Sequence, residues 1–113
     1  MTFEEFNEYQ NNLLEQVVQM KNTKGKEYAN STSRFANFDR LANRLKQPRL
    51  VIALIYFTKH MDAIESYINN SRIYSEETIQ GRILDAITYL TLIGGMIQED
   101  ESKIDVNKTT WVL

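Results

Sequence analysis

The sequence of 113 residues contains no cysteine, one proline and four glycines. Without cysteine the chain can form neither a disulfide nor a thiolate metal site, so we expect a reducing compartment, the cytoplasm (that of the host if a phage encodes the protein). No apolar run approaches the ~20 residues that a membrane-spanning helix needs, and the first residues do not resemble a signal peptide, so no membrane partner is expected. So few glycines and prolines favour long, uninterrupted helices.

Apolar residues recur at intervals of three and four in four segments, residues 2–20, 33–46, 49–70 and 75–97. This spacing predicts four amphipathic helices, the third of them central because residues 50–57 are apolar on all sides. Ser75 is the expected N-cap of the last helix. We therefore expect an all-α domain, a four-helix bundle over residues 1–98, followed by a short tail of residues 99–113. The tail ends in Trp-Val-Leu and is expected to dock on the core or on a second copy, which predicts a homo-oligomer.

Charge is distributed unevenly, although the net charge is only −2. Residues 21–49 carry eight Lys and Arg side chains against two acidic ones. A basic segment within a mildly acidic chain indicates a local anion site more than a general nucleic-acid surface. Duplex nucleic acid is not favoured as a partner, because no recognition motif accompanies the basic residues. The alternative, in which these cations solvate helix faces and pair with the acidic ends of the chain, stays open.

The polar segment 22–33 is expected to be an inter-helix loop around Gly25. Two lysines, Lys24 and Lys26, flank this glycine. Backbone N–H groups next to lysines at the start of a helix can hold a phosphate. The segment lacks the Walker pattern and no strand precedes it, so a solvated loop is the alternative interpretation.

Asp85 stands in the middle of the apolar pattern of the last predicted helix. A carboxylate there is costly to bury unless it meets a cation, a metal or several donors, which makes Asp85 a site candidate. A magnesium site is one interpretation, built from Asp62, Glu65, Glu77 and Asp85. Arg82, three residues before Asp85, stands where a second acid would be needed, and favours pairing with Asp85 or with a ligand phosphate. His60 is the only histidine, so a histidine metal cluster or a Ser-His-Asp triad is excluded, and we expect it to be structural or exposed.

Short motifs in fixed order resemble the small nucleotide-modification-associated domain of phages and bacteria. They are Lys24-x-x-x-Tyr28, Asn37-Phe38, Lys59, Glu77 and Ile83-x-Asp85-x-x-x-Tyr89-Leu90. That domain is distantly similar to the all-α, MazG-like NTP pyrophosphohydrolases. The resemblance covers residues 20–97 and implies a helical fold with a nucleotide ligand held by Lys24, Tyr28, Asn37, Lys59, Asp85 and Tyr89. The enzymes carry paired acids on facing helices; Asp62-x-x-Glu65 resembles one pair, but Arg82-x-x-Asp85 does not supply the other.

Three functions follow as hypotheses. The first is a non-catalytic protein, without a required cofactor, that binds a mono-, di- or cyclic nucleotide. In it Tyr28 or Phe38 stacks on the base, Asn37 reads the base edge, and Lys26, Arg34 and Arg82 add charge. Such a protein could sequester a nucleotide signal of a host defence or serve nucleotide supply. The second is a Mg²⁺-dependent NTP pyrophosphohydrolase, and the third is a protein–protein interaction module. Because Arg82 stands where a second acid would be needed, we rank nucleotide binding above hydrolysis.

Overall fold

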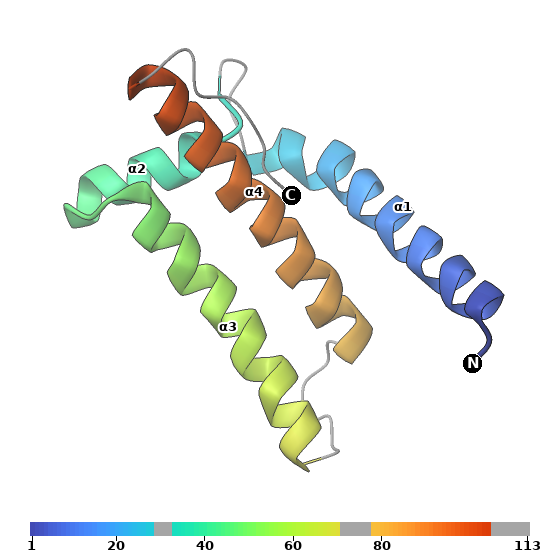
Figure 1. Cartoon of the computed structure of the whole chain (residues 1–113). Coiled ribbons are helices and arrows are strands. Elements are labelled where there is room, and N and C mark those ends of the chain that lie inside the picture. The colour runs from blue at the N-terminus through green and yellow to red at the C-terminus, as the bar shows by residue number, and fades with distance from the viewer. Residues whose placement is uncertain (29–32, 71–77, 105–113) are drawn as a thin grey trace.

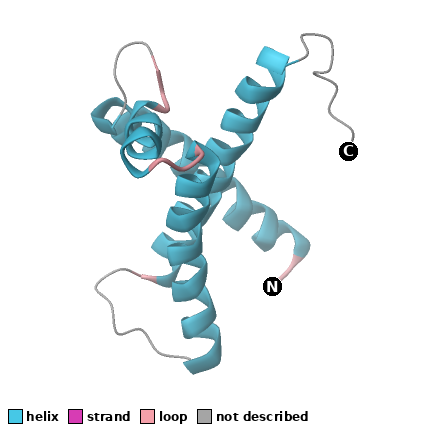
Figure 2. Cartoon of the chain, turned by 90° about the vertical axis from the view of Figure 1, so that its left-hand side faces the viewer, coloured by secondary structure: helices cyan, strands magenta, loops and turns pink. Residues whose placement is uncertain are grey.

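The computed structural model describes residues 1–28, 33–70 and 78–104, with only the helical backbone described for residues 21–28 and 104. This part of the chain folds into four α-helices without a strand: α1 (Phe3–Tyr28), α2 (Ala36–Leu45), α3 (Arg49–Asn70) and α4 (Ile79–Ile104). Figure 2 shows the same helices, and the described residues outside them are drawn as loops. The expected all-α, bundle-like architecture is confirmed. None of these helices is both long and apolar enough to cross a membrane.

Local hydrogen bonds account for several of the helix ends. Thr2 Oγ1 accepts the backbone N–H of Glu5 at 3.1 Å, which caps α1. Thr78 Oγ1 accepts the N–H of Gly81 at 3.1 Å, so Thr78 caps α4, whereas the predicted cap, Ser75, lies outside the described residues. Lys46 closes α2 in the left-handed conformation, with φ of 54°. α4 also continues to Ile104, beyond the predicted end at residue 97.

The expected loop at residues 22–33 is wrong for most of its length, because α1 continues to Tyr28. Lys24, Gly25 and Lys26 all lie within the helix, so their backbone N–H groups belong to helical residues and not to a phosphate-binding loop. A single glycine costs a helix only about 1 kcal/mol relative to alanine, and the lysines and glutamate around it are good helix formers. The chain leaves the helix after Tyr28, later than the polar composition indicated.

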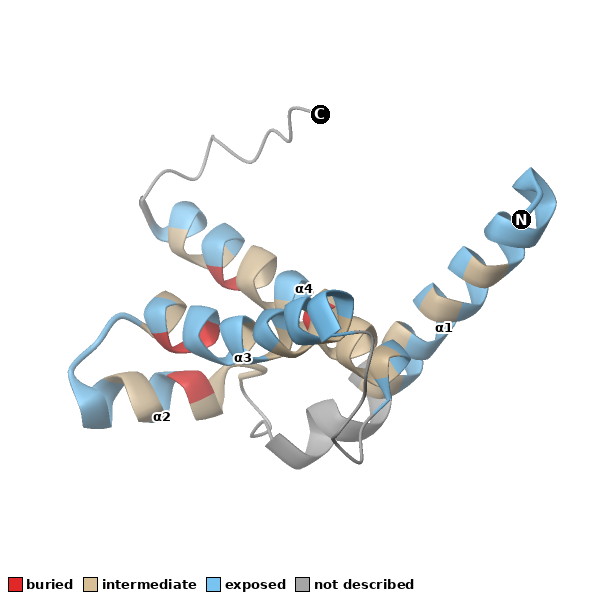
Figure 3. Ribbon diagram, turned by 90° about the horizontal axis from the view of Figure 1, so that it is seen from below, coloured by how far each residue is buried: buried red, intermediate tan, exposed pale blue. Residues whose placement is uncertain are grey.

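The antiparallel pair α3 and α4 forms the centre of the fold, α2 packs on α3, and α1 lies along the other side of α4 (Figure 1). The hydrophobic core consists of Phe38 from α2, Ile52 and Ala53 from α3, and Met96 from α4. Figure 3 shows buried residues on these three helices, while the N-terminal part of α1 extends away from them and is mostly exposed. α3, predicted to be central because residues 50–57 are apolar all round, belongs to this central pair, although Leu54 and Ile55 are exposed.

One arginine joins three helices at the end of the molecule where α2 meets α3. The Arg49 guanidinium donates to Asp100 at 2.8 Å, to Glu99 at 3.0 Å and to Asp39 at 3.3 Å. It also lies over the ring of Phe35, 5.3 Å from the ring centroid. Burial by itself would lower the pKa of Arg49, but the hydrogen bonds and charges of the carboxylates outweigh it and raise the pKa above its ordinary value. Arg49 therefore holds α2, α3 and α4 together as a cation.

α4 contains two adjacent glycines, Gly94 and Gly95, and a close approach exists at Gly95 alone. A Cβ atom on Gly95 would lie 3.0 Å from Cζ of Phe35, whereas one on Gly94 would meet nothing within 4 Å. The missing side chain lets the Phe35 ring lie against the α4 backbone. The Arg49 guanidinium lies over the same ring, so the absence of a side chain at Gly95 helps to position the junction of the three helices.

Candidate functional site

A cavity of about 540 Å³ lies between α2, α3 and α4, next to the side chain of Met20 from α1. Its volume falls within the range of about 300–1,000 Å³ that is usual for small-molecule sites. The lining combines basic, aromatic and polar side chains with an apolar floor: Met20, Arg34, Asn37, Phe38, Arg40, Leu41, Tyr56, Lys59, His60, Asp85, Thr88, Tyr89 and Leu92. The cavity is the candidate functional site.

Helical spacing explains how the lining residues reach one place. On α3 they are Tyr56, Lys59 and His60, three and four residues apart, which puts them on one side of that helix. On α4, Asp85, Thr88, Tyr89 and Leu92 follow the same intervals. The two helices pack against each other in opposite directions, so these two faces meet, and α2 closes the cavity with Asn37, Phe38 and Leu41.

Four rings form a connected aromatic cluster along the cavity. Phe38 sets its edge against both Tyr56 and Tyr89, with centroid distances of 6.3 Å and interplanar angles of 80° and 89°. Tyr56 and Tyr89 are stacked at 6.1 Å and 20°. The His60 ring lies 5.3 Å from that of Tyr89. Edge-to-face and offset-stacked pairs are the arrangements that aromatic rings favour, so this cluster fixes the shape of the wall.

Positive charge prevails among the lining residues. Arg34, Arg40 and Lys59 face a single carboxylate, Asp85, so the described lining carries a net charge of +2 with His60 neutral. Arg40 and Lys59 are exposed and Arg34 is half-buried, which leaves their charged groups within reach of a ligand entering from solvent. A concave surface with an excess of cations concentrates anions. The cavity thus has the electrostatics of an anion-binding site.

Asp85 and His60 lie next to each other on the inner part of the lining. His60 Nδ1 is 3.8 Å from Asp85 Oδ2, and their side chains are 12% and 21% exposed. That distance is too long for a direct hydrogen bond, and it becomes an ion pair only when the imidazole is protonated. Asp85 thus presents a carboxylate acceptor to the cavity beside the imidazole of His60.

Six of the predicted ligand-binding residues line the cavity: Arg34, Asn37, Phe38, Lys59, Asp85 and Tyr89. Arg82 is half-buried on α4 but is not part of the lining. Glu77 lies outside the described residues, as do the side chains of Lys24, Lys26 and Tyr28 and the whole of Trp111.

Sequence reasoning missed Arg40, Tyr56 and His60 as lining residues. His60 was expected to be structural or exposed; it is half-buried, packs against Tyr89 and also lines the cavity. A weak signal existed: Tyr56, Lys59 and His60 are three or four residues apart, which puts three side chains with polar ends on one side of α3.

The carboxylates of the magnesium hypothesis are not brought together in the part of the chain that the structure describes. Asp62 and Glu65 are exposed, and their positions on α3 face away from His60 by roughly 140–160° at 100° per residue. No three His, Asp or Glu side chains among the described residues lie close enough to hold a metal ion. The described cavity therefore offers one carboxylate, that of Asp85.

Comparisons with protein-family models, with curated proteins and with solved structures give no match. The function is therefore inferred from the cavity and from the residues that line it.

Proposed function

We propose that this protein binds a phosphorylated nucleotide in the cavity between α2, α3 and α4 and does not hydrolyse it. The observation that carries the proposal is the convergence of three aromatic rings and three cations on one cavity of about 540 Å³. Bases are recognised by stacking and phosphates by cations, so a nucleotide uses both halves of this lining. A ligand with only one of the two features would leave half of the lining without a role.

The base is assigned to the aromatic wall. Phe38, Tyr56 and Tyr89 hold one another in place through the contacts described above. These side chains therefore lose little further conformational freedom when a base stacks on them. Stacking of a base on an aromatic side chain is worth about 1–3 kcal/mol. Asn37 lies beside Phe38 in the sequence and in the lining, and its amide offers both donors and an acceptor to the edge of a base.

The phosphates are assigned to Arg34, Arg40 and Lys59. The planar guanidinium of each arginine can donate two parallel hydrogen bonds to one phosphate group, and lysine adds a mobile point charge. Asp85 would repel a phosphate and instead suits a hydroxyl donor, which places the ribose on its side of the cavity. This arrangement is compatible with linear and with cyclic nucleotides.

Binding without turnover follows from the acid count of the described lining. Metal-assisted hydrolysis of a pyrophosphate needs several carboxylates that converge on the metal ions. Asp85 is the one carboxylate that the described residues supply to the cavity, and Asp62 and Glu65 lie on another side of α3. The resemblance to the phage and bacterial domain gives the proposal a context, the sequestration of a signalling nucleotide used in host defence or a role in nucleotide supply.

The experiment that tests the proposal is a thermal-shift screen against mono-, di-, tri- and cyclic nucleotides, with and without Mg²⁺, followed by chromatography of the recovered ligand. A ligand that binds the folded chain raises its melting temperature according to its concentration and affinity. We expect stabilisation without Mg²⁺ and an intact ligand. A shift that needs Mg²⁺ and releases pyrophosphate would instead establish the pyrophosphohydrolase. No shift with any nucleotide would rule out both and leave the interaction module.

A further inference from the structure

The carboxylate of Asp85 lines the cavity without a lysine or arginine partner among the described residues. The sequence allowed a pair with Arg82, one turn away on α4, but no salt bridge between described residues joins the two. The charged or polar group beside it is His60 Nδ1 at 3.8 Å, which is beyond hydrogen-bond distance. The Asp85 side chain is only 21% exposed, so it has lost much of its hydration. A donor that enters the cavity would therefore stabilise this acceptor.

Asp85 and Lys59 lie at the same level of the α3–α4 pair, one step from the stacked tyrosines. Tyr56 and Tyr89 stack across the two helices and define the first level. Lys59 follows Tyr56 by three residues, and Asp85 precedes Tyr89 by four. Because the helices are antiparallel (Figure 1), both steps run in the same direction, by about 4.5 Å and about 6 Å at 1.5 Å per residue. The 3.8 Å between His60 and Asp85 agrees with this second shared level.

These two levels match the order of the parts in a nucleotide. At the tyrosine level Phe38 contacts both rings, and its neighbour Asn37 is available to the edge of a base. At the next level a cation and a carboxylate face the cavity from different helices. The sugar of a nucleoside 5′-phosphate carries its phosphate and its hydroxyls at different corners. The phosphate can thus lie toward Lys59 and the hydroxyls toward Asp85, whereas the reverse placement would set two negative charges together.

We propose that Asp85 makes the cavity selective for ribonucleotides over 2′-deoxyribonucleotides, an inference that rests on the proposed function. A carboxylate has two acceptor oxygens, and the neighbouring 2′- and 3′-hydroxyls of a ribose offer two donors. A deoxyribose lacks the first of these donors. One oxygen of a partly buried carboxylate is then left without a hydrogen bond, which costs affinity. Acidic side chains hold ribose hydroxyls in dinucleotide-binding proteins in the same way.

Thr88 is the neighbouring polar residue of α4 in the lining, and it suits this role less well. Its hydroxyl donates to the backbone oxygen of Leu84 at 2.9 Å, within its own helix. As an acceptor it is neutral, and hydrogen bonds to an ionised acceptor are about twice as strong as those between neutral groups. The selectivity is therefore assigned to Asp85.

The first test compares each ribonucleotide with its 2′-deoxy counterpart by titration calorimetry, using the 5′-mono-, di- and triphosphates of adenosine, guanosine and cytidine. We expect the ribonucleotide to bind about tenfold more tightly or better, because a hydrogen bond to a charged group has about that effect on affinity. Equal affinities for the two forms would overturn this proposal and leave the proposed function standing. Binding of neither form would overturn the proposed function, and this proposal with it.

Substitution of Asp85 shows whether its carboxylate causes the preference. In Asp85→Ala the preference should disappear, mainly through weaker binding of the ribonucleotide. Asp62→Ala removes an exposed carboxylate of α3 and should keep both affinities. Arg40→Gln should weaken both forms alike and keep the preference, since Arg40 is assigned to the phosphates. A preference that survives Asp85→Ala, or that Arg40→Gln abolishes, would overturn the proposal.

Asp85→Asn covers the case in which Asp85→Ala fails to fold. The amide keeps the size of the side chain but has one acceptor oxygen in place of two, so the preference should shrink. The melting temperature of the unliganded variant should not fall, because the described residues form no salt bridge from a lysine or arginine to this carboxylate. A lower melting temperature with an unchanged preference would give Asp85 a structural role and overturn the proposal.

Discussion

Tyr56 on α3 and Tyr89 on α4 lie stacked, with ring centroids 6.1 Å apart and ring planes 20° apart, and both rings line the candidate cavity. Since each comes from a different helix, the packing of α3 on α4 also builds the wall of the site. Phe38 of the core contacts both rings edge-on, so the cavity is an extension of the hydrophobic core.

The stacked pair makes a first prediction about nucleotide binding. Tyr56→Leu keeps an apolar side chain of useful size but removes the flat ring. We expect the dissociation constant for the nucleotide found in the screen to rise about tenfold, because stacking on a base contributes about 1–3 kcal/mol. Titration calorimetry measures the change. Tyr67→Leu on the same helix, outside the lining, is the control and should bind as the wild type does; equal losses would indicate a general effect on α3.

Arg40 tests the assignment of the phosphates. Arg40→Gln should weaken binding about tenfold, because a charge-assisted hydrogen bond contributes about 1.5 kcal/mol or more. The difference in affinity between the wild type and Arg40→Gln should shrink as the salt concentration rises, because screening weakens the attraction between Arg40 and the phosphate in the wild-type protein. Arg44→Gln makes the same change of charge on the same helix outside the lining, and should leave affinity within about twofold of wild type. Unchanged binding by Arg40→Gln would remove this residue from the site.

Asp85 separates binding from hydrolysis. Asp85→Asn removes the charge and keeps the size, so affinity should fall if the carboxylate accepts a ribose hydroxyl, with no turnover to lose. Asp62→Asn, an exposed change on α3, should bind normally. Under the magnesium hypothesis both variants would abolish a measurable pyrophosphate release while retaining some affinity, and that result would contradict the proposed function.

Gly95 offers a test of packing with a built-in control. Alanine at either glycine should gain up to about 1 kcal/mol of helix propensity. At Gly94, where the Cβ meets nothing, the full gain should appear as a higher free energy of unfolding. At Gly95 the Cβ would press on Phe35 at 3.0 Å, and overpacking of this kind costs about 1–3 kcal/mol. Chemical denaturation should therefore rank Gly94→Ala above wild type and Gly95→Ala below Gly94→Ala; equal values would show that Phe35 yields freely.

Arg49 should be the most stabilising of the described cations. Arg49→Met removes its hydrogen bonds to Glu99, Asp100 and Asp39 and leaves these acids next to one another, so we expect a loss of about 1–3 kcal/mol in the free energy of unfolding. Arg49→Lys should recover part of it, because lysine keeps the charge without the planar fork. Lys103→Met, which breaks an exposed pair with Glu99, should cost less than about 0.5 kcal/mol.

The sign of the pKa shift fixes the pH range of this effect. A cation whose pKa is raised on folding contributes its full stability at every pH below its unfolded pKa. Arg49 itself does not titrate near neutral pH. The difference in the free energy of unfolding between Arg49→Met and the wild type should therefore not be reduced there by deprotonation of Arg49. A loss of the difference on mild alkaline titration would contradict the ion-pair assignment.

Local sequence patterns predicted the helices well because helix formation depends on neighbours in the chain. The 3–4 spacing located α2 and α3 closely, and the predicted segment starting at residue 2 located the start of α1. The end of α1 was misplaced because polar residues with good helix propensity look like a loop when only composition is weighed. Residues 50–57, apolar all round, predicted a central α3, and α3 contacts both α4 and α2; the pattern did not show which of these residues are buried, and in α3 they are Ile52 and Ala53.

The site was harder to predict because it depends on contacts between helices. Asp85 was identifiable as a carboxylate within an apolar pattern, and Asn37, Phe38, Lys59 and Tyr89 through the family resemblance. Tyr56 carries no such mark, and it becomes a lining residue only because α4 brings Tyr89 against it. The separation of Asp62 from Asp85 likewise depends on how α3 is rotated, which spacing along one helix does not determine.

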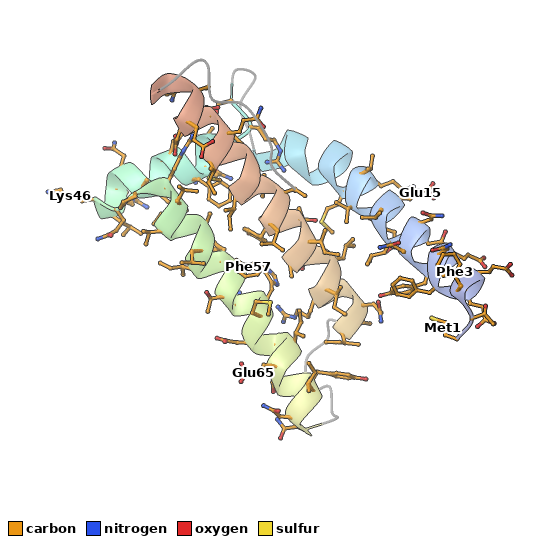
Figure 4. The ribbon with its side chains drawn as sticks, viewed as in Figure 1. Met1, Phe3, Glu15, Lys46, Phe57 and Glu65 are labelled. Carbon is orange, nitrogen blue, oxygen red and sulfur yellow. The ribbon has the colours of Figure 1, made fainter. Side chains whose placement is uncertain are left out.

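The attachment of α1 has a consequence for exchange with solvent. α1 contacts α4, with Tyr9 donating a hydrogen bond to Gln80 at 2.7 Å, and it adds no side chain to the hydrophobic core cluster of the described residues. Phe3, near the start of α1, lies far from α3 (Figure 4). Its detachment from α4 should therefore require less free energy than global unfolding, and its amides should exchange with deuterium before those of α3 and α4. Since Met20 lies in the cavity lining, a bound ligand that touches Met20 should slow this exchange along α1. The first helix would then report occupancy of a site that the other three helices build.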